Sequence, residues 1–313
     1  MNFDLLLQRY REQRELLNFS ARTWPTIRGV LGQLRRTLDP RQLEDVGAIT
    51  TDTLTGFRHW LFYEPTARGA ARAIATQNRC LSIVKGFFAF LLEDGAIGRD
   101  PAAALLHARE PHTLPRNVLT PPEARRILEK PDVQTVLGYR DRTLLEVLYA
   151  TGIRRSELMA LTVADARLDE GLLRINGGKG ARDRVVPLTQ IAVAFLETYL
   201  AGIRPRMLGG APSDRLFISR RGRPMSKNAI ADVVGKYAKL ARIKKRVTPH
   251  CWRHTCATHL VKNSANLRHV QEMLGHKQLS TTERYLHLTI ADLKAAHRKC
   301  HPREREARGR GDG

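Results

Sequence analysis

The stretch that decides the fold and chemistry of this chain lies near its C-terminal end, where residues 274–285 read LGHKQLSTTERY. Shortly before it, residues 250–254 read HCWRH. Four of their side chains supply a phenol, two imidazoles and a guanidinium. A nucleophile, proton carriers and a fixed positive charge are the groups that attack on a phosphodiester requires. The side chains concerned are His250, Arg253, His276 and Tyr285.

Two further cations stand in motif-like surroundings upstream. Arg154 lies in residues 150–158, ATGIRRSEL, and Lys179 lies in residues 177–180, GGKG. A guanidinium forks onto two phosphate oxygens and keeps its charge, so Arg154 and Arg253 are predicted to hold the attacked phosphate. Either could instead be an exposed arginine in a chain with 53 Lys and Arg. The residues on both sides of Arg154 favour the phosphate-binding interpretation.

The remaining polar residues receive roles as proton carriers. A lysine on a glycine-rich turn can protonate a departing deoxyribose oxygen, and we predict this role for Lys179. His250 precedes Arg253 by three positions, which on a helix puts both on one face, where His250 could accept the proton of Tyr285 or orient the phosphate. His254 points to another side of that helix and is predicted to be structural. The turn around Lys179 lacks the spacing of a nucleotide-binding phosphate loop.

Tyr285 is predicted to be the nucleophile, because a tyrosine forms a phosphoester and can still be displaced later. A tyrosine on a helical segment is more often a packing or surface aromatic, so the preceding motif is what favours catalysis. His276 follows Gly275 at a predicted helix end and is expected to donate a hydrogen bond to the phosphate. Capping the helix carbonyls is the competing role for this imidazole. The absence of acidic clusters in the sequence argues against a two-metal nuclease.

The charge of the chain favours a polyanionic partner. Its 313 residues carry a formal net charge of +22 and a pI near 10.6. Such an excess attracts nucleic acid, and it extends too widely to be one solvated face. A membrane surface is less favoured, because the sequence contains neither a basic amphipathic stretch nor an apolar run of about 18 residues.

The cysteines and the N-terminal segment indicate the cellular setting. Residues 1–9 lack the basic leader and apolar stretch of a secretory signal, so a cytoplasmic location is expected. Four dispersed cysteines in a chain of this size are expected to be reduced. A zinc site among the His and Cys side chains of residues 250–259 is the alternative to simple packing, but a second ligand pair at zinc-finger spacing is missing.

The expected fold is mainly α, with an N-terminal helical bundle and a second, mixed α/β domain that contains a small antiparallel sheet. Residues 1–108 show apolar positions at spacings of three and four, which predict helices over 4–17, 23–38, 51–61 and 76–94. A short helix is expected from residue 100 toward residue 107. Residues 109–118 contain prolines among charged residues, as in an interdomain linker.

The second domain is predicted to span residues 119–298, with a basic disordered tail over 299–313. Thr120 and Glu123 form a capping box at its first helix, and residues 141–149 form a buried helix. Strands are predicted over 163–168, 172–175 and 184–188, with Lys179 on the turn between the last two. Helices are expected over the ranges 191–200, 227–241, 250–261, 265–274 and 290–298.

In order and setting, Arg154, Lys179, His250, Arg253, His276 and Tyr285 resemble the active-site positions of the tyrosine recombinase or integrase family, with a style nearest to Xer-like and phage-type members. The departures are modest: residues 251 and 252 are Cys and Trp where small or aliphatic residues often occur, and Arg155 adds a charge beside Arg154. The resemblance covers nearly the whole chain, and residues 1–108 resemble the family's core-binding domain.

The resemblance implies a site-specific recombinase that cuts and rejoins duplex DNA through a 3′-phosphotyrosine and resolves a Holliday junction. It implies clamping of DNA with inverted half-sites between two domains, assembly of four protomers, either alone or together with a related recombinase, and no metal or nucleotide cofactor. A type IB topoisomerase and a non-catalytic DNA-binding protein are the alternatives. The target sequence, and a chromosomal as against a plasmid, phage or transposon role, stay open.

Overall fold

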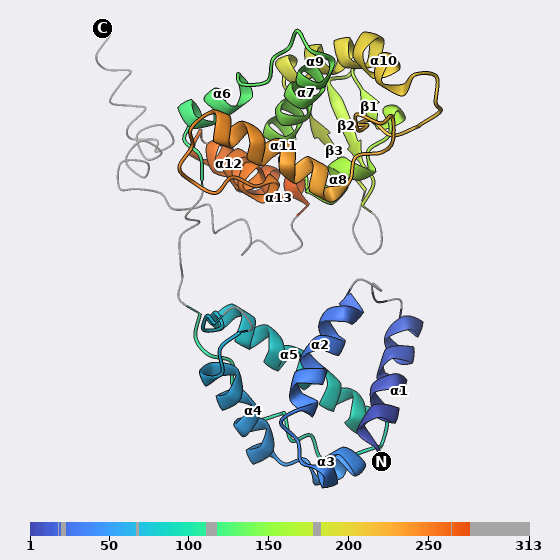
Figure 1. Cartoon of the computed structure of the whole chain (residues 1–313), viewed down its shortest axis with the longest axis vertical. Coiled ribbons are helices and arrows are strands. Elements are labelled where there is room, and N and C mark those ends of the chain that lie inside the picture. The colour runs from blue at the N-terminus through green and yellow to red at the C-terminus, as the bar shows by residue number, and fades with distance from the viewer. Residues whose placement is uncertain are drawn as a thin grey trace, which may run out of the picture. The chain divides into compact units, whose positions relative to one another are not determined.

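A computed structural model describes residues 1–17, 19, 23–66, 69–110, 118–177, 183–263 and 265–275. The chain divides into two compact units, Met1–His112 and Thr113–Gly313, each with its own hydrophobic core (Figure 1). The division falls inside the segment 109–118 predicted to be a linker. No helix of the described residues is both long and apolar enough to cross a membrane.

The first unit is a helical bundle built around α5. Its elements are α1 (Phe3–Leu16), α2 (Trp24–Arg35), α3 (Pro40–Glu44), a 3-10 turn (Val46–Ala48), α4 (Thr51–Tyr63) and α5 (Ile74–Glu93). Helix α5 contacts α1, α2 and α4. Phe87 of α5 is fully buried, with its ring centroid 5.5 Å from that of Phe3 and 5.4 Å from that of Tyr10. Burial of side chains of this size contributes about 1.5–3 kcal/mol each, so these rings anchor α1 to α5.

The segment after α5 returns along this helix. The buried Asn78 side chain donates to the Ala108 carbonyl (2.8 Å) and accepts from the Ala108 amide (2.9 Å). Lys85 donates to the carbonyls of Ala103 and Leu105. These bonds satisfy backbone groups of a segment without regular structure and hold it on the bundle.

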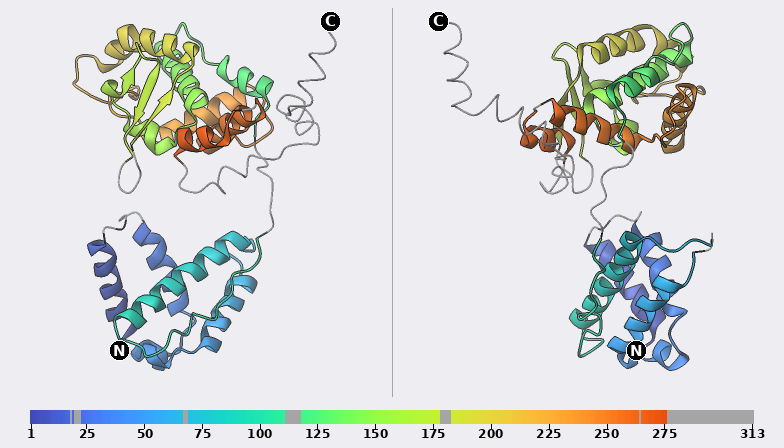
Figure 2. Two further views of the ribbon diagram at one scale, coloured as in Figure 1. Left: turned by 180° about the vertical axis from the view of Figure 1, so that it is seen from behind. Right: turned by 90° about the vertical axis from the view of Figure 1, so that its left-hand side faces the viewer.

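The second unit combines helices with a small sheet. Its α-helices are α6 (Pro121–Leu128), α7 (Val136–Thr151), α8 (Arg155–Ala160), α9 (Gln190–Thr198), α10 (Arg204–Leu208), α11 (Lys227–Leu240), α12 (Pro249–Lys262) and α13 (Leu267–Leu274). A π-helix, Tyr199–Ile203, joins α9 to α10. The strands β1 (Ala166–Arg167), β2 (Leu172–Ile175) and β3 (Arg184–Pro187) form an antiparallel sheet in the order β1-β2-β3. Figure 2 shows this sheet and the surrounding helices from two further sides. The expected fold class, mainly α with a small antiparallel sheet, is confirmed.

Helix α7 forms the centre of this unit and contacts α9, α12 and β3. The fully buried Trp252 of α12 packs edge-on against Tyr149 of α7, with ring centroids 5.5 Å apart. The start of the unit is bonded to α12, because the Leu119 amide donates to Thr255 Oγ1 (3.1 Å) and the Leu119 carbonyl lies 2.9 Å from His259 Nε2. The predicted capping box at Thr120 and Glu123 is confirmed. These contacts fix α12, which carries His250 and Arg253, against α7, which ends just before Arg154.

Two predicted elements are wrong. In residues 163–168, only Ala166–Arg167 is a strand, since Val163–Asp165 forms a 3-10 turn in which Asp165 accepts from the Thr162 amide and hydroxyl. The short helix expected over 100–107 is a turn followed by irregular chain, in which the carbonyls of Ala103 and Leu105 accept from Lys85 and not from amides of a continuing helix. The predicted helix 290–298 and the tail 299–313 lie outside the described residues.

Candidate active site

Arg253 is the buried centre of the candidate site. It lies in α12, which begins at Pro249 with Thr248 as its cap, the Thr248 hydroxyl accepting from the Cys251 amide at 3.2 Å. Only 4% of Arg253 is exposed. Its Nη1 donates to the Gly152 carbonyl (2.8 Å) and its Nη2 donates to the Leu274 carbonyl (2.7 Å). The guanidinium therefore joins the C-terminal ends of α7 and α13.

Gly152 allows this close approach. It ends α7 in the left-handed conformation with φ 58°, where side chains are disfavoured. A Cβ at this position would lie 2.8 Å from Leu274 Cδ2 and 3.2 Å from Cys256 Sγ. The glycine in the TGIRR motif thus lets α13 and α12 pack directly against the end of α7.

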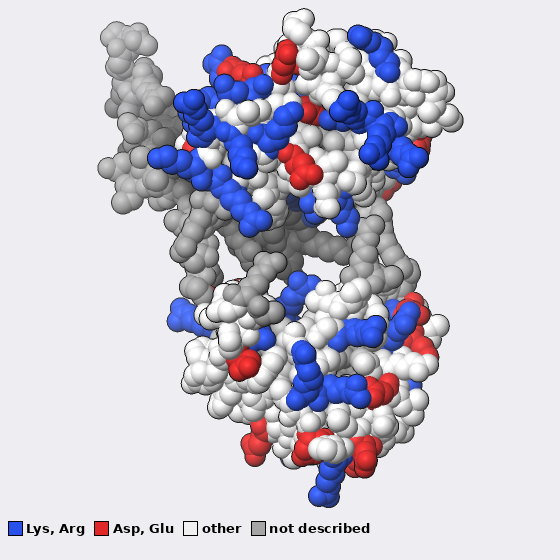
Figure 3. All heavy atoms as spheres, viewed as in Figure 1, with Lys and Arg blue, Asp and Glu red and all other residues white. Residues whose placement is uncertain are grey.

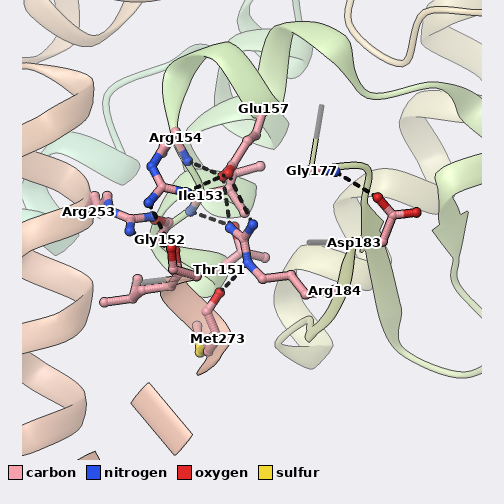
Figure 4. A network of polar contacts seen from close by, with 12 residues as sticks. Thr151, Gly152, Ile153, Arg154, Glu157, Gly177, Asp183, Arg184, Arg253 and Met273 are labelled. Carbon is pink, nitrogen blue, oxygen red and sulfur yellow. Dashed lines mark hydrogen bonds and ion pairs between the residues drawn. The ribbon is translucent and has the colours of Figure 1, made fainter. Parts of the chain in front are cut away.

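Arg154 follows as the cap of α8, and its side chain is 41% exposed. Its Nη1 donates to Glu157 Oε1 (2.8 Å) and its Nη2 donates to the Gly275 carbonyl (2.9 Å). Its backbone amide donates to Glu157 Oε2, also at 2.8 Å. Arg154 and Arg253 thus meet at the same end of α13, as Figure 4 shows for their guanidinium groups. Because Arg154 keeps much of its surface exposed, it can receive a further anionic acceptor.

Glu157 and Arg184 complete the network and were not recognised in the sequence. Arg184 of β3 forks onto both carboxylate oxygens of Glu157, at 3.0 and 2.8 Å, while its Nε donates to the Met273 carbonyl at 2.8 Å (Figure 4). Burial raises the pKa of Glu157, but the hydrogen bonds from Arg184 and from the Arg154 amide outweigh it and hold the pKa below its usual range. The spacing of Arg154 and Glu157, typical of a capping box, was a signal for Glu157. No local signal marked Arg184.

His250 lies one turn before His254, and the two imidazoles touch. Their Nε2 atoms are 2.7 Å apart and their rings meet edge to face. The prediction that His254 points to another side is therefore wrong, because residues four apart share one face of a helix. Burial, together with the charge of Arg253, lowers the pKa of His250 from its usual value. This favours the neutral imidazole, which can accept a proton.

The other three candidate residues, Lys179, His276 and Tyr285, lie outside the residues that the structure describes. The structure does describe residues that flank these three in the sequence. The hairpin that carries Lys179 is closed by a bond from the Gly177 amide to Asp183 Oδ1 (2.9 Å). Helix α13 ends at Gly275, with φ 65°, immediately before His276. Of the six candidate residues, the structure thus describes Arg154, His250 and Arg253, and it brings the two arginines together.

The cysteines of α12 pack in the interior. Cys251 and Cys256 are 5% and 3% exposed, and burial raises the pKa of Cys256 to about 12. Among the described residues, no group of three or more His, Cys, Asp or Glu side chains is placed to hold a metal ion. The described part of the site is therefore a cationic one built from guanidinium groups.

Two guanidinium groups that meet at one helix end form a cationic site of the kind that stabilises the charge of a phosphoryl group during transfer. The model of the phage integrase family matches residues 117–291. The chain is 40% identical over 234 residues to tyrosine recombinase XerD of Staphylococcus aureus, covering 75% of this chain and 78% of that protein. It is 36% identical over 302 residues to tyrosine recombinase XerC 2 of Ralstonia nicotianae, covering 95% and 87%. The chain belongs to the phage integrase family and is a tyrosine recombinase, an enzyme of site-specific DNA recombination.

Solved structures show the same fold. The crystal structure of XerA recombinase is 27% identical, with a TM-score of 0.53 and coverage of 95% of this chain and 98% of that one. A lambda integrase dimer bound to a COC′ core site gives a TM-score of 0.69 at 20% identity, with coverage of 91% and 95%. The latter likeness concerns the fold alone.

Proposed function

We propose that Arg154 and Arg253 hold the scissile phosphate of duplex DNA while Tyr285 attacks it. The observation that carries this proposal is the convergence of both guanidinium groups on the end of α13, the helix that leads directly to His276. A pentacoordinate phosphate gains negative charge, and fixed guanidinium groups stabilise it without reorganisation. The site needs no metal in this mechanism, because the arginines supply the positive charge.

The proton transfers follow from the residues around this phosphate. Neutral His250 takes the proton of the Tyr285 phenol, and the phenolate oxygen forms a bond to phosphorus. The bond from phosphorus to the 5′ oxygen breaks, and Lys179 protonates that oxygen as it leaves. His276 donates a hydrogen bond to a nonbridging oxygen. Attack by a 5′ hydroxyl on the 3′-phosphotyrosine reverses these steps and rejoins a strand.

The distribution of charge supports duplex DNA as the partner. Residues 204–246 contain 13 Lys and Arg and only 2 Asp and Glu. Lys and Arg side chains cover much of the face of the second unit shown in Figure 3, which includes α11 and α12. Exposed members of this segment are Arg206, Arg220, Arg221, Arg223, Lys227, Lys236, Lys239, Arg242, Lys244 and Arg246.

We further propose that Met1–His112 and the second unit close together around DNA with inverted half-sites. Four protomers, with a related recombinase as a possible partner, would exchange strands through a Holliday junction. The relatives are named as recombinases, which supports exchange between two sites over relaxation of one duplex. A cytoplasmic location is part of this proposal, because the relatives come from bacteria, whose DNA lies in the cytoplasm.

A covalent trapping experiment tests the nucleophile. Full-length Tyr285→Phe is first used to select a binding duplex from a random-sequence library. A version of that duplex, nicked close to the cleavage site, releases a short fragment after attack and traps the enzyme on DNA. The wild-type chain is expected to form the adduct, whereas Tyr285→Phe binds the duplex and forms none. An adduct at wild-type yield with the Phe variant shows that Tyr285 is not the nucleophile.

A second measurement separates recombination from relaxation. Two copies of the selected duplex, labelled differently, are incubated with the wild-type chain, and a supercoiled plasmid with one copy serves as the other substrate. Recombination predicts exchanged products and junctions from the paired duplexes. Relaxation of the plasmid without any exchange contradicts the proposed function.

A further inference from the structure

The end of α13 is held by three arginines, each bonded to a different carbonyl. Arg184 takes the Met273 carbonyl, Arg253 takes that of Leu274, and Arg154 takes that of Gly275. The last carbonyls of a helix have no partner within it and lie at the negative end of its dipole. Guanidinium groups are well suited to this end, so these bonds fix the direction in which the chain continues toward His276.

The proposed mechanism gives no role to Arg184, although this residue is part of the arrangement. It is a residue of β3, only 11% exposed, and its guanidinium lies against the chain at Gly275, where a Cβ would meet it at 3.0 Å. The same guanidinium forks onto both oxygens of Glu157, which is 10% exposed. One side chain therefore connects the sheet, the start of α8 and the end of α13.

Glu157 is shared by two cations. Its Oε1 accepts from Arg154 at 2.8 Å and from Arg184 at 3.0 Å. If Arg184 were absent, the carboxylate would face Arg154 alone and would compensate its positive charge. With Arg184 present, the pair Arg184 and Glu157 is neutral, and the charge of Arg154 stays available for an anion.

We propose that Arg184 is a positioning residue of the cleavage site, which neutralises Glu157 and fixes the end of α13 so that Arg154 presents an uncompensated charge to the scissile phosphate. Arg184 acts through Arg154 and does not itself touch DNA. The inference rests on the proposed function, because it assumes that Arg154 binds this phosphate.

The test uses Arg184→Met in the full chain with the selected nicked duplex. Adduct formation is expected to slow by about 100-fold, since a small displacement of a catalytic group has effects of this size. Binding of the intact duplex, measured with Tyr285→Phe and with the double variant, is expected to be unchanged. Arg167→Met is the matched control, because Arg167 also lies in the sheet and pairs with a glutamate, Glu170, but is 49% exposed. It should cleave as the wild type does.

A substrate with an uncharged scissile group distinguishes positioning of charge from a structural defect. In a methylphosphonate, a methyl group replaces one charged nonbridging oxygen, so the transition state depends less on cations. Arg184→Met is expected to differ from the wild type by less than about tenfold on this substrate. An equal defect on phosphodiester and methylphosphonate overturns the proposal. A wild-type chain that forms no adduct on the phosphodiester contradicts the proposed function instead.

Two further variants guard against misfolding as the cause. Arg184→Lys keeps the charge but loses the fork, so its rate should fall between the wild type and Arg184→Met. Glu157→Gln combined with Arg184→Met removes the carboxylate charge and should cleave faster than Arg184→Met alone. Full activity of the Lys variant shows that the fork is unnecessary, and a double variant no faster than Arg184→Met shows that the charge of Glu157 is irrelevant. Either result overturns the proposal.

Discussion

At the scale of single residues, Arg154 and Arg253 share one proposed task but lie in different environments. Arg253 is 4% exposed and bonds to two carbonyls from different helices. Arg154 is 41% exposed and bonds to Glu157 and to the Gly275 carbonyl. A buried donor that leaves two buried acceptors behind is costly to remove, whereas removal of the half-exposed Arg154 leaves Glu157 still paired with Arg184.

Substitution by alanine should therefore separate the two arginines. Arg253→Ala is expected to lower the free energy of unfolding by about 2–4 kcal/mol, and Arg154→Ala by less than about 1 kcal/mol. Both should slow adduct formation by about 100-fold or more, because each removes a donor from the phosphate. Urea unfolding of the full chain measures the loss of stability. Adduct formation on the nicked duplex measures the loss of rate. Equal losses of stability would show that Arg253 has no structural role of its own.

His250 gives a prediction for pH. Burial and the charge of Arg253 lower its pKa in the folded chain, whereas the unfolded chain carries an ordinary histidine, which titrates near pH 6.5. The unfolded state therefore takes up this proton first, and the contribution of His250 to stability is lost as pH falls below about 6.5. Since the neutral form is the proposed base, the acid limb of adduct formation should lie below the ordinary histidine range.

The measurement is the rate of adduct formation from about pH 5 to 8, with ionic strength held constant. His250→Asn should remove the acid limb together with most of the rate. His59→Asn, on an exposed face of α4, is the control and should leave the profile unchanged. An acid limb at or above the ordinary histidine value contradicts the role of His250 as base.

The sequence predicted residues of the candidate site only where local motifs surround them. Arg154 and Arg253 were predicted because each stands in a short phrase with recognisable neighbours. Arg184 was not, since its partners Glu157 and Met273 lie 27 and 89 positions away and meet it only in the folded chain. His254 was misplaced because its helical face was judged by its neighbour Arg253 and not by His250, one turn earlier.

At the scale of elements, the site depends on how two helices end. Helix α7 ends at Gly152 with φ 58°, and α13 ends at Gly275 with φ 65°. Both carbonyls accept from an arginine of the site. Gly275 marked the end of the helix predicted over 265–274, which the structure has as Leu267–Leu274. The helix predicted over 141–149 was too short, because α7 runs from Val136 to Thr151 and ends at Gly152. The 3-10 turn at Val163–Asp165 was missed, because apolar residues there resemble a strand.

Gly152→Ala should disturb both the fold and the reaction. A side chain at this φ costs about 1 kcal/mol, and the added Cβ would lie 2.8 Å from Leu274 and 3.2 Å from Cys256, which costs about 1–3 kcal/mol more. The shift also moves the carbonyl to which Arg253 donates, so adduct formation should slow. Gly171→Ala is the matched control, since Gly171 has φ 65° but nothing within 4 Å of its Cβ position.

Unfolding free energies and adduct rates of the two variants give the comparison. Gly171→Ala should show the strain of the backbone alone, with an unchanged rate. If the two variants lose equal stability and cleave equally well, close packing of α7 against α13 is not needed by the site.

At the scale of the whole molecule, the positive charge is unevenly divided. Met1–His112 contains 15 Lys and Arg against 12 Asp and Glu, which is +3 of the chain's +22 and leaves +19 for the rest. The sequence predicted two units and a polyanionic partner. Because composition was considered for the whole chain, it did not show that the second unit carries most of the charge.

This division makes the contribution of the first unit to DNA binding measurable. The affinity of a protein for duplex DNA falls with salt in proportion to the number of phosphates it neutralises. If the first unit closes around DNA, a chain lacking residues 1–112 should bind the selected duplex more weakly at every salt concentration and discriminate less against unrelated duplexes. Its salt dependence should decrease only modestly, because +19 remains in the second unit.

Binding of the full chain and of residues 113–313 is measured at several salt concentrations, with the selected and a scrambled duplex. Circular dichroism of the shorter chain establishes that it is folded, as its separate core and the bonds of Leu119 to α12 lead us to expect. Equal affinity, equal salt dependence and equal discrimination for the two chains would show that Met1–His112 does not embrace DNA. Recognition would then belong to the second unit alone, and the clamp would have to be abandoned.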